Sequence, residues 1–367
     1  MSDSTKLPPF DQKEIDNAKE VPNFKGAATV TTYDFPVTPR EAYLATYRDH
    51  DPMWIINDTE YQRFEPSIIP DNCARGFVEE AVPFPREKFG GKDMFGIEWV
   101  YVDVAGGSMV KPGEPYLTEI SEWHDKLVWP DVDSWDWDGS AKLNKDYLDT
   151  DRANLMWLLN GCWFERLISF MDFQYAAMAL VDEDDVEEVK ELTHELTTLY
   201  MHIVDNCCDA YDKLDGFEIH DDWGSQKSPF FSEDVGREVY LPEMKRFVDH
   251  VHSKGKFINL HSCGHIEDRA DIFVEAGFDG WIPMAMNDSS ALYDKYGDKM
   301  VIAIVENIPE NLADYSEEDQ IALADEFVEK YTKGSKVAAY SYYSDPDVMT
   351  PAFRAELYKQ SRIRYAE

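Results

Sequence analysis

Residues 257–281 read FINLHSCGHIEDRADIFVEAGFDGW and hold a short apolar run, an amphipathic segment and the start of a second apolar run. This order predicts a strand, a helix and a strand. Side chains alternate between the two faces of a strand, so His261 and Cys263 are expected on the same face at the strand's end. A histidine and a cysteine placed in this way can turn toward one point, as a metal site with soft ligands requires.

The same alternation continues through the C-terminal two-thirds of the chain. Apolar runs that end in polar residues predict strands at 215–224, 256–264, 279–286, 300–308 and 336–345. Amphipathic or well-capped segments predict helices at 182–211, 232–255, 266–277, 289–297 and 316–334. Strands linked by helical crossovers form parallel sheets, and the expected fold is an α/β TIM (β/α)8 barrel. A doubly wound open sheet is the alternative, although no glycine-rich phosphate turn follows any of these strands.

The N-terminal part predicts an extension followed by one domain. Residues 1–35 are polar and punctuated by prolines, which is typical of a loosely tied terminal segment. Thr38, Pro39 and Glu41 predict a helix start, and residues 36–367 are expected to form a single barrel domain. Residues 93–137 are aromatic and rich in turn signals, which indicates strands and loops rather than long helices.

Composition excludes several classes of partner. The formal net charge of −38 repels polyanions, so neither nucleic acid nor an anionic membrane surface is an expected partner. No apolar run approaches the ~20 residues that span a bilayer, and the first residues do not resemble a signal peptide. The five cysteines have no regular spacing. We therefore expect a cytoplasmic protein whose cysteines are thiols.

Polar residues gather at the predicted C-terminal ends of the strands, where barrel enzymes carry their chemistry. These segments are EIHDDWGSQ (218–226), NLHSCGH (259–265), VENIPEN (305–311) and YSYYSD (340–345). Each also has a structural interpretation. Cys263 could be a small buried apolar residue, Asp221 and Asp222 could cap a helix, and Tyr340 and its neighbours could fill the barrel mouth.

The order of several motifs resembles the uroporphyrinogen decarboxylase superfamily, from about Thr38 to the end of the chain. The motifs are TPREAYLATYRDHDP, DMFGIEW, WPDVDSWDW, EIHDDWGSQ, NLHSCGHI and GDKMVIAIVENIP. This resemblance implies a single TIM-type barrel that is either a decarboxylase or a corrinoid-dependent methyltransferase. The decarboxylase carries substrate-binding arginines after the first helix, where this chain reads IND (56–58). The methyltransferase branch is therefore favoured, with the O-demethylase methyltransferases and the methylcobamide methyltransferases as the members resembled.

The methyltransferase branch uses H-x-C at the end of the fifth strand as two zinc ligands, and His261 and Cys263 match that motif. Many members take a third ligand from a late cysteine, but this chain has no cysteine beyond Cys263. We therefore expect an oxygen ligand, Glu218 first and Glu306 next; the alternative is a member of the branch that has lost the metal. One thiolate, one imidazole and one carboxylate leave zinc a stronger Lewis acid than several thiolates do.

The expected function is transfer of a methyl group from an O-methyl donor, with an aryl methyl ether as the expected class, to the cobalt(I) of a corrinoid (cobalamin) on a separate protein. Asp222 is expected to orient the substrate or to donate a proton, which requires a raised pKa, and Glu306 shares the catalytic role. Aromatic residues near the strand ends are expected to stack on the substrate ring: Trp223, Trp281, Tyr340, Tyr342 and Tyr343. A zinc-dependent methylcobamide:thiol methyltransferase and a barrel that only binds a ligand are the alternatives.

Overall fold

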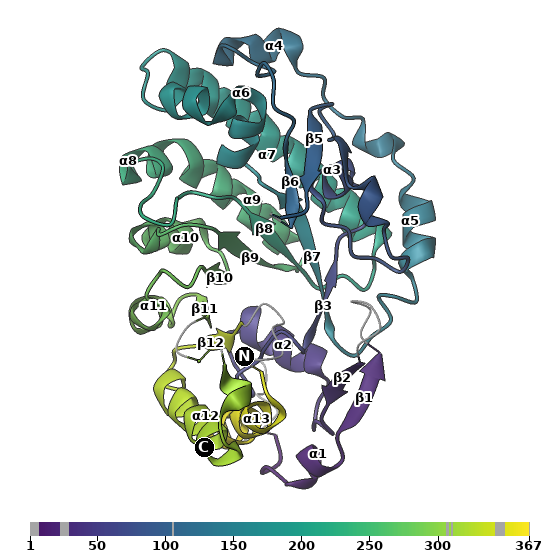
Figure 1. Cartoon of the computed structure of the whole chain (residues 1–367), viewed down its shortest axis with the longest axis vertical. Helices are drawn as coiled ribbons and strands as arrows, with labels where there is room; N and C mark the ends of the chain where they lie inside the picture. The colour runs from purple at the N-terminus through teal and green to yellow at the C-terminus, as the bar shows by residue number, and fades with distance from the viewer. Residues whose placement is uncertain are drawn as a thin grey trace. The chain divides into compact units, whose positions relative to one another are not determined.

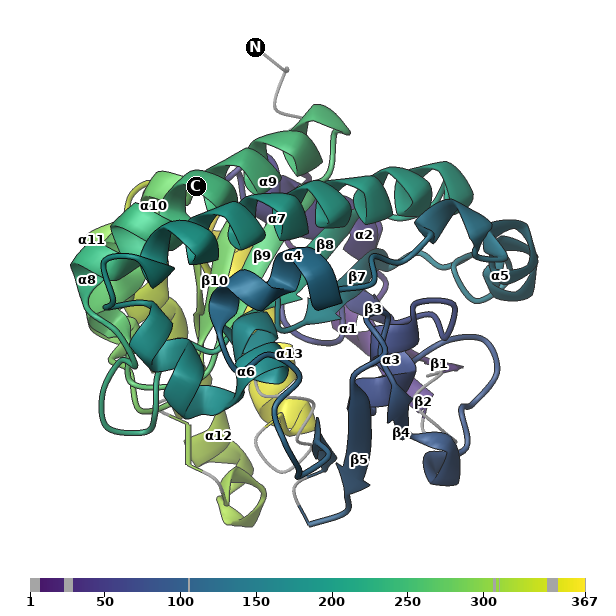
Figure 2. The same ribbon diagram turned by 90° about the horizontal axis from the view of Figure 1, so that it is seen from above.

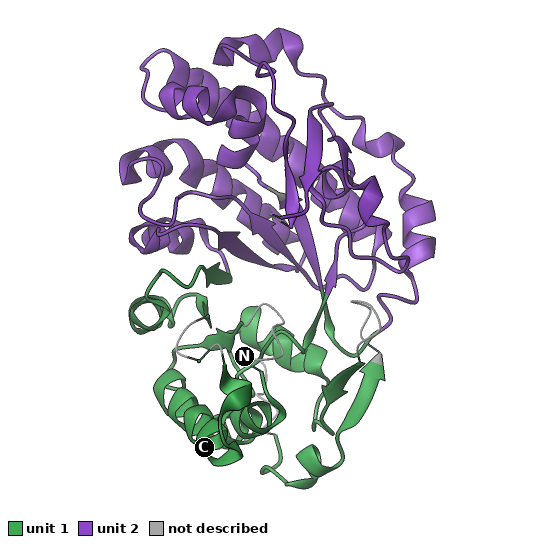
Figure 3. Cartoon of the chain, viewed as in Figure 1, with its two compact units in different colours: residues 1–62, 150–154, 279–367 green, residues 63–149, 155–278 purple. Residues whose placement is uncertain are grey.

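The computed structural model describes residues 7–22, 29–104, 106–305, 308–309, 311–341 and 349–366. The chain divides into two compact units (Figure 3). Unit 1 contains residues 1–62, 150–154 and 279–367, and unit 2 contains residues 63–149 and 155–278. Among the described helices, none is both long enough and apolar enough to cross a membrane.

Unit 2 is built on parallel strands β7 (Ala153–Asn160, whose first two residues belong to unit 1), β8 (Gly216–His220) and β9 (Phe257–Ser262). Every residue of β9 is buried, which explains why its sequence is apolar almost throughout rather than alternating. The ladder between β8 and β9 is regular and places His220 directly opposite His261. This register brings the ends of the two strands level with each other.

Helices follow these strands along the chain. They are α6 (Phe164–Ala179), α7 (Asp185–Ala210), α8 (Glu233–Val235), a π-helical turn η4 (Gly236–Tyr240), α9 (Leu241–Ser253), η5 (Glu267–Arg269) and α10 (Ala270–Ala276). Helices α7, α9 and α10 lie side by side in both views (Figures 1 and 2). The amphipathic pattern of α7 explains its packing, because Val189, Leu192, Leu196 and Leu199 are all buried on one stripe.

The first half of unit 2 carries a small antiparallel sheet of β4 (Gly90–Lys92), β5 (Glu98–Val102) and β6 (Gly107–Val110). Short helices surround it in the chain. They are α3 (Pro70–Arg75), η1 (Arg86–Lys88), η2 (Ile120–Glu122), α4 (Trp123–Lys126), η3 (Val132–Ser134) and α5 (Trp137–Asn144). The prediction of strands and loops over residues 93–137 is therefore confirmed.

Unit 1 contains parallel strands β10 (Gly280–Pro283), β11 (Val301–Ile304) and β12 (Ala338–Tyr340). Its helices are α1 (Lys13–Asp16), α2 (Pro39–Tyr47), α11 (Ser289–Tyr296), η6 (Leu312–Asp314), α12 (Glu317–Tyr331) and α13 (Pro351–Arg364). Strands β1 (Lys19–Pro22) and β2 (Thr29–Thr32) form an antiparallel pair. The predicted helix start at Thr38 is confirmed, because its hydroxyl accepts from the Glu41 N–H and the Glu41 carboxylate accepts from the Thr38 N–H.

The fold is mixed α/β with helices between parallel strands, as the sequence predicted, but the expected ring of eight strands is incomplete. Among the described residues, seven strands of this kind are found where the sequence predicted eight: β3 (Tyr61–Phe64) and β7 to β12. Within unit 1, Asn57 and Tyr340 share an isolated parallel bridge, and the Tyr340 N–H donates to the Ile56 carbonyl over 2.8 Å. In the described residues, this single bridge replaces a continuous ladder at that point. Division into an N-terminal extension and one domain stays a prediction.

Candidate metal centre

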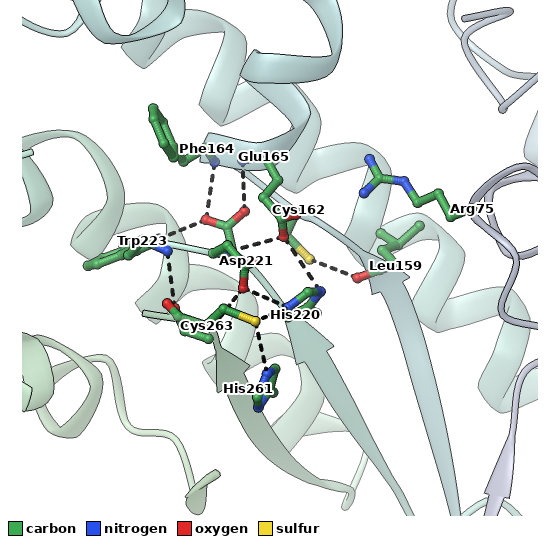
Figure 4. A network of polar contacts seen from close by, with 12 residues as sticks. Arg75, Leu159, Cys162, Phe164, Glu165, His220, Asp221, Trp223, His261 and Cys263 are labelled. Atoms are coloured by element: carbon green, nitrogen blue, oxygen red, sulfur yellow. Dashed lines mark hydrogen bonds and ion pairs between the residues drawn. The ribbon is translucent and has the colours of Figure 1, made fainter. Parts of the chain in front are cut away.

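Four side chains meet at the ends of β8 and β9: His220, Asp222, His261 and Cys263. Figure 4 shows His220, His261 and Cys263 of this group. Each can offer one ligand atom, and those four atoms all lie within 4.8 Å of one another. All four residues belong to unit 2. Each strand contributes a histidine and, two residues later, a second ligand type, because alternate residues face the same side.

The distances between the soft ligands match a zinc site. The Sγ of Cys263 lies 3.6 Å from Nε2 of His261 and 3.9 Å from Nε2 of His220. Zn–S bonds of about 2.3 Å and Zn–N bonds of about 2.0–2.1 Å in a tetrahedron place sulfur and nitrogen about 3.6 Å apart. The donor set of two imidazoles, one thiol and one carboxylate also suits zinc. These residues therefore fit the metal that the sequence predicted.

Asp222 makes a different contact from the other three. Its Oδ1 lies 2.7 Å from Nε2 of His220, whereas oxygen and nitrogen ligands of one tetrahedral zinc stand about 3.4 Å apart. The distance is that of a hydrogen bond, and the same Oδ1 also accepts from the Cys263 N–H over 2.6 Å. Asp222 thus joins the end of β8 to the end of β9.

Glu165, near the start of α6, contacts both His220 and the backbone of Asp222. Its Oε2 accepts from the Asp222 N–H over 3.0 Å and lies 3.6 Å from Nδ1 of His220. A carboxylate on one ring nitrogen of a histidine favours the tautomer whose other nitrogen faces the metal position. Nε2 of His220, the nitrogen near Cys263, is therefore the candidate ligand atom, and a metal there would replace its proton and its hydrogen bond to Asp222.

Asp221 fixes the position of α6 relative to the cluster. Its Oδ1 accepts from the backbone N–H groups of Trp163 and Glu165, over 2.9 and 3.1 Å. Its Oδ2 accepts from the Phe164 N–H over 3.1 Å and from the Trp223 indole N–H over 2.8 Å. Asp221 is fully buried, and its carboxylate accepts from backbone N–H groups at the start of α6 that have no partner within the helix. The capping interpretation of the Asp221-Asp222 pair therefore applies to Asp221, which caps α6.

The electrostatics of the cluster favour positive charge. Burial acts against the charged form of His220, but Glu165 and the hydrogen bond to Asp222 raise the pKa of His220 well above its ordinary value. Burial would raise the pKa of Asp222, but the hydrogen bond and charge of His220 hold that pKa at about 2. Burial raises the pKa of the Cys263 thiol. A proton donor role for Asp222 needs a raised pKa, and the structure places it in the opposite direction.

The remaining predicted site residues lie elsewhere or outside the described residues. Glu218 is a buried residue in β8, opposite Asn259, and is not among the four grouped side chains. Trp223 is fully buried against Phe231, Tyr240 and Phe273, so its ring is not open to a substrate.

Trp281 and Tyr340 are buried residues of unit 1, and Tyr340 packs against Phe327 and Phe353. Glu306, Tyr342 and Tyr343 lie outside the described residues.

Sequence reasoning missed His220 and Glu165. Alternation along a strand puts Glu218, His220 and Asp222 on one face, but alternation alone cannot choose among them. The signal that could have identified His220 is its match to His261, since H-x-D on one strand repeats the spacing of H-x-C on the next. Glu165 has no such signal, because it enters through a helix more than fifty residues away in the sequence.

Comparison by sequence gives no match, either to a family model or to a curated protein. Comparison by structure finds a methyltransferase from Methanosarcina mazei, with a TM-score of 0.58 and 16% sequence identity over 89% of this chain and 98% of that one. An endo-beta-1,4-xylanase from Gloeophyllum trabeum aligns over 61% of this chain and 78% of that one, with a TM-score of 0.32 and 14% identity, and carries no weight. Because the sequences are only 16% identical, this match shows a shared fold and nothing more.

Proposed function

We propose that this protein is a zinc-dependent methyltransferase that takes a methyl group from an O-methyl donor, an aryl methyl ether by preference, and passes it to the cobalt(I) of a corrinoid on a separate protein. The observation that carries the proposal is the cluster of His220, His261 and Cys263 with the spacing of zinc ligands. Two further facts support it: the fold is shared with a methyltransferase, and the H-x-C motif resembles that of the corrinoid-dependent branch.

His220, His261 and Cys263 are the proposed ligands, and Asp222 stands beside the position that remains open. When bound, the zinc ion would act as a Lewis acid on the ether oxygen, which a shell with a single thiolate favours. Glu165 would hold His220 in the required tautomer. Asp222 would hold the ends of β8 and β9 together through its hydrogen bond from the Cys263 N–H.

The reaction balances without an external oxidant. Cobalt(I) supplies the electron pair of the new cobalt–carbon bond and becomes cobalt(III), while the methyl–oxygen bond breaks and its pair stays on the oxygen. The phenolate then takes a proton from water and leaves as a phenol. The contribution of the chain is to place the oxygen and the methyl carbon in line with the acceptor and to exclude competing solvent.

The metal assignment is tested by zinc content per purified chain, without any assay of activity. We expect near-stoichiometric zinc in the wild type, a loss in His220→Ala, His261→Ala and Cys263→Ala, and retention in Asp222→Ala. Matched controls are His265→Ala, which removes an exposed histidine two residues after Cys263, and Cys208→Ala, which removes a half-buried thiol in α7. Equal zinc in the His261 and Cys263 variants and in the controls would discard this centre.

The reaction is tested with a corrinoid protein reduced to cobalt(I) and a panel of methoxylated aromatic compounds. We expect a visible spectral change as methylcobalt(III) forms, together with an equimolar amount of phenol, and neither product with Cys263→Ala. Methyl transfer from methylcobalt to a thiol, with no ether cleaved, would instead assign the thiol methyltransferase alternative. Bound zinc without either reaction would indicate a barrel that only binds a ligand.

A further inference from the structure

A pocket of about 340 Å³ lies in unit 2 between the small antiparallel sheet and α6. One part of its wall is apolar and aromatic, formed by Trp99, Met109 and Ile168, and another part carries the guanidinium of Arg75. This volume suits a small aromatic molecule. Glu165 also lines the pocket, so the residue that supports His220 is shared by the pocket and the metal cluster.

Arg75 is the unusual member of this wall. Its side chain is 3% exposed, and two of its nitrogens, Nε and Nη2, are buried without a hydrogen-bond acceptor among the described residues. Three acidic residues lie near Arg75 and each has another partner: Asp71 and Asp93 bind the buried guanidinium of Arg166, and Oε2 of Glu165 accepts from the Asp222 N–H. Oδ1 of Asp71 lies 3.8 Å from Nε of Arg75, which is too far for a hydrogen bond. A buried cation with unfilled donors costs free energy that an incoming acceptor would recover.

The position of Arg75 is held from two sides. Its guanidinium lies over the indole of Trp99, 4.3 Å from the ring centroid, and the Trp99 indole N–H is itself fixed by Asp93 over 3.1 Å. On the other side is Gly161, where a Cβ would stand only 2.4 Å from Nη1 of Arg75. The Gly161 N–H donates to the His220 carbonyl over 2.8 Å. Arg75 is therefore linked to the metal cluster through one residue.

We propose that Arg75 binds a carboxylate of the methyl donor, so that the protein selects methoxylated aromatic acids over neutral aryl methyl ethers. This inference rests on the proposed function for the identity of the donor. A guanidinium presents paired N–H groups that match the two oxygens of a carboxylate. The ring would lie along Trp99 and Met109, which are apolar and aromatic.

The remaining charges of the pocket fix where that carboxylate can lie. Glu165 and Asp172 also line the pocket and repel an anion, so the guanidinium is the favourable position for it. The chain as a whole also repels anions, with a formal net charge of −38. Added salt screens this repulsion, and we expect it to weaken carboxylate binding less than it weakens an ordinary surface ion pair.

The test compares two ligands that differ in one group, 3-methoxybenzoate and 3-methoxybenzamide, by calorimetric titration of the full chain without corrinoid. We expect wild type to bind the benzoate at least about tenfold more tightly, the effect of one charge-assisted hydrogen-bonded pair. Arg75→Gln should lose that preference. Arg86→Gln, which removes an arginine that is 61% exposed, should keep it.

If Arg75→Gln fails to fold, the wild-type ratio decides alone, and a preference below tenfold overturns the proposal. Equal preference in the Arg75 and Arg86 variants also overturns it. The binding measurement itself does not require the proposed reaction, so the two proposals can fail separately. A preference for benzoate with no ether cleaved would refute the function and keep the anion site, whereas cleavage of neutral and acidic ethers alike would do the reverse.

Discussion

Replacement of Asp221 by Asn should destabilise the protein strongly, although the side chain keeps its size. In the structure, each carboxylate oxygen accepts two hydrogen bonds from α6 and Trp223. An amide keeps one accepting oxygen and turns an NH2 group toward the other two donors. Two buried donors without partners cost about 1–3 kcal/mol each, and the remaining bonds lose their charge assistance. Burial raises the pKa of Asp221 to about 7, so we expect the full loss of about 3–5 kcal/mol at pH 8, where the carboxylate is ionised.

The corresponding change in melting temperature follows from the size of the chain. An unfolding entropy of about 2.1 cal/mol/K per residue amounts to about 0.77 kcal/mol/K for 367 residues, so Asp221→Asn should lower Tm by about 4–7 °C. Differential scanning calorimetry measures this directly. Asp234→Asn, an exposed aspartate in the first turn of α8, is the matched control and should shift Tm by less than about 1 °C. Equal shifts in the two variants would refute the capping role assigned to Asp221.

Three further changes test other parts of the structure. Burial raises the pKa of Glu60 to about 7, so ionisation of Glu60 penalises the folded state. As pH rises from 4.5 to 7, the free energy of unfolding of wild type should fall by up to about 3 kcal/mol relative to that of Glu60→Gln. The measurement is the Tm of both proteins at pH 4 and pH 8. A Cβ at Gly264, where φ is +104°, would lie 2.4 Å from the Gly224 backbone, so Gly264→Ala should unfold the site and abolish zinc binding. Gly255→Ala, with φ of +71° and open space around it, should lower the free energy of unfolding by only about 1–2 kcal/mol. Equal losses of stability in the two variants would contradict the clash at Gly264. The Tm of wild type should be about 3–4 °C higher with free zinc 100-fold above its Kd than after a chelator has removed the zinc, whereas the Tm of Cys263→Ala should be the same in both conditions. A difference of the same size in both proteins would place the metal elsewhere.

The sequence predicted the elements of the fold better than their closure. The strands at β8 to β12 and the helices between them follow from apolar period and from caps such as Thr38 and Ser316, whose hydroxyls accept from the helix N–H groups as expected. Closure of a ring depends on pairing between residues that are far apart in sequence, such as Asn57 and Tyr340. Local patterns carry no information on that pairing.

For the candidate site, the sequence predicted His261, Cys263 and Asp222 but not His220, which the structure brings into the same group of four side chains. Alternation placed Glu218, His220 and Asp222 on one face, and the decision among them came from the register that sets His220 opposite His261. The predicted stacking role of Trp223 overlooked its indole N–H, which Asp221 draws into the interior. Arg75 was missed because its neighbours, Trp99 and Gly161, are brought to it only by the tertiary fold.

The matched pairs on β8 and β9 have a consequence for how such a centre can diversify. His220 stands opposite His261 at the last pair of the ladder, and just beyond it the Asp222 carboxylate accepts from the Cys263 N–H, which joins the two strand ends. A thiol at position 222 would place a second sulfur beside the two imidazoles, but a thiol is a weaker acceptor than a carboxylate and would hold the Cys263 N–H less firmly. A softer ligand set at this point would therefore come at the expense of the link between the two strand ends.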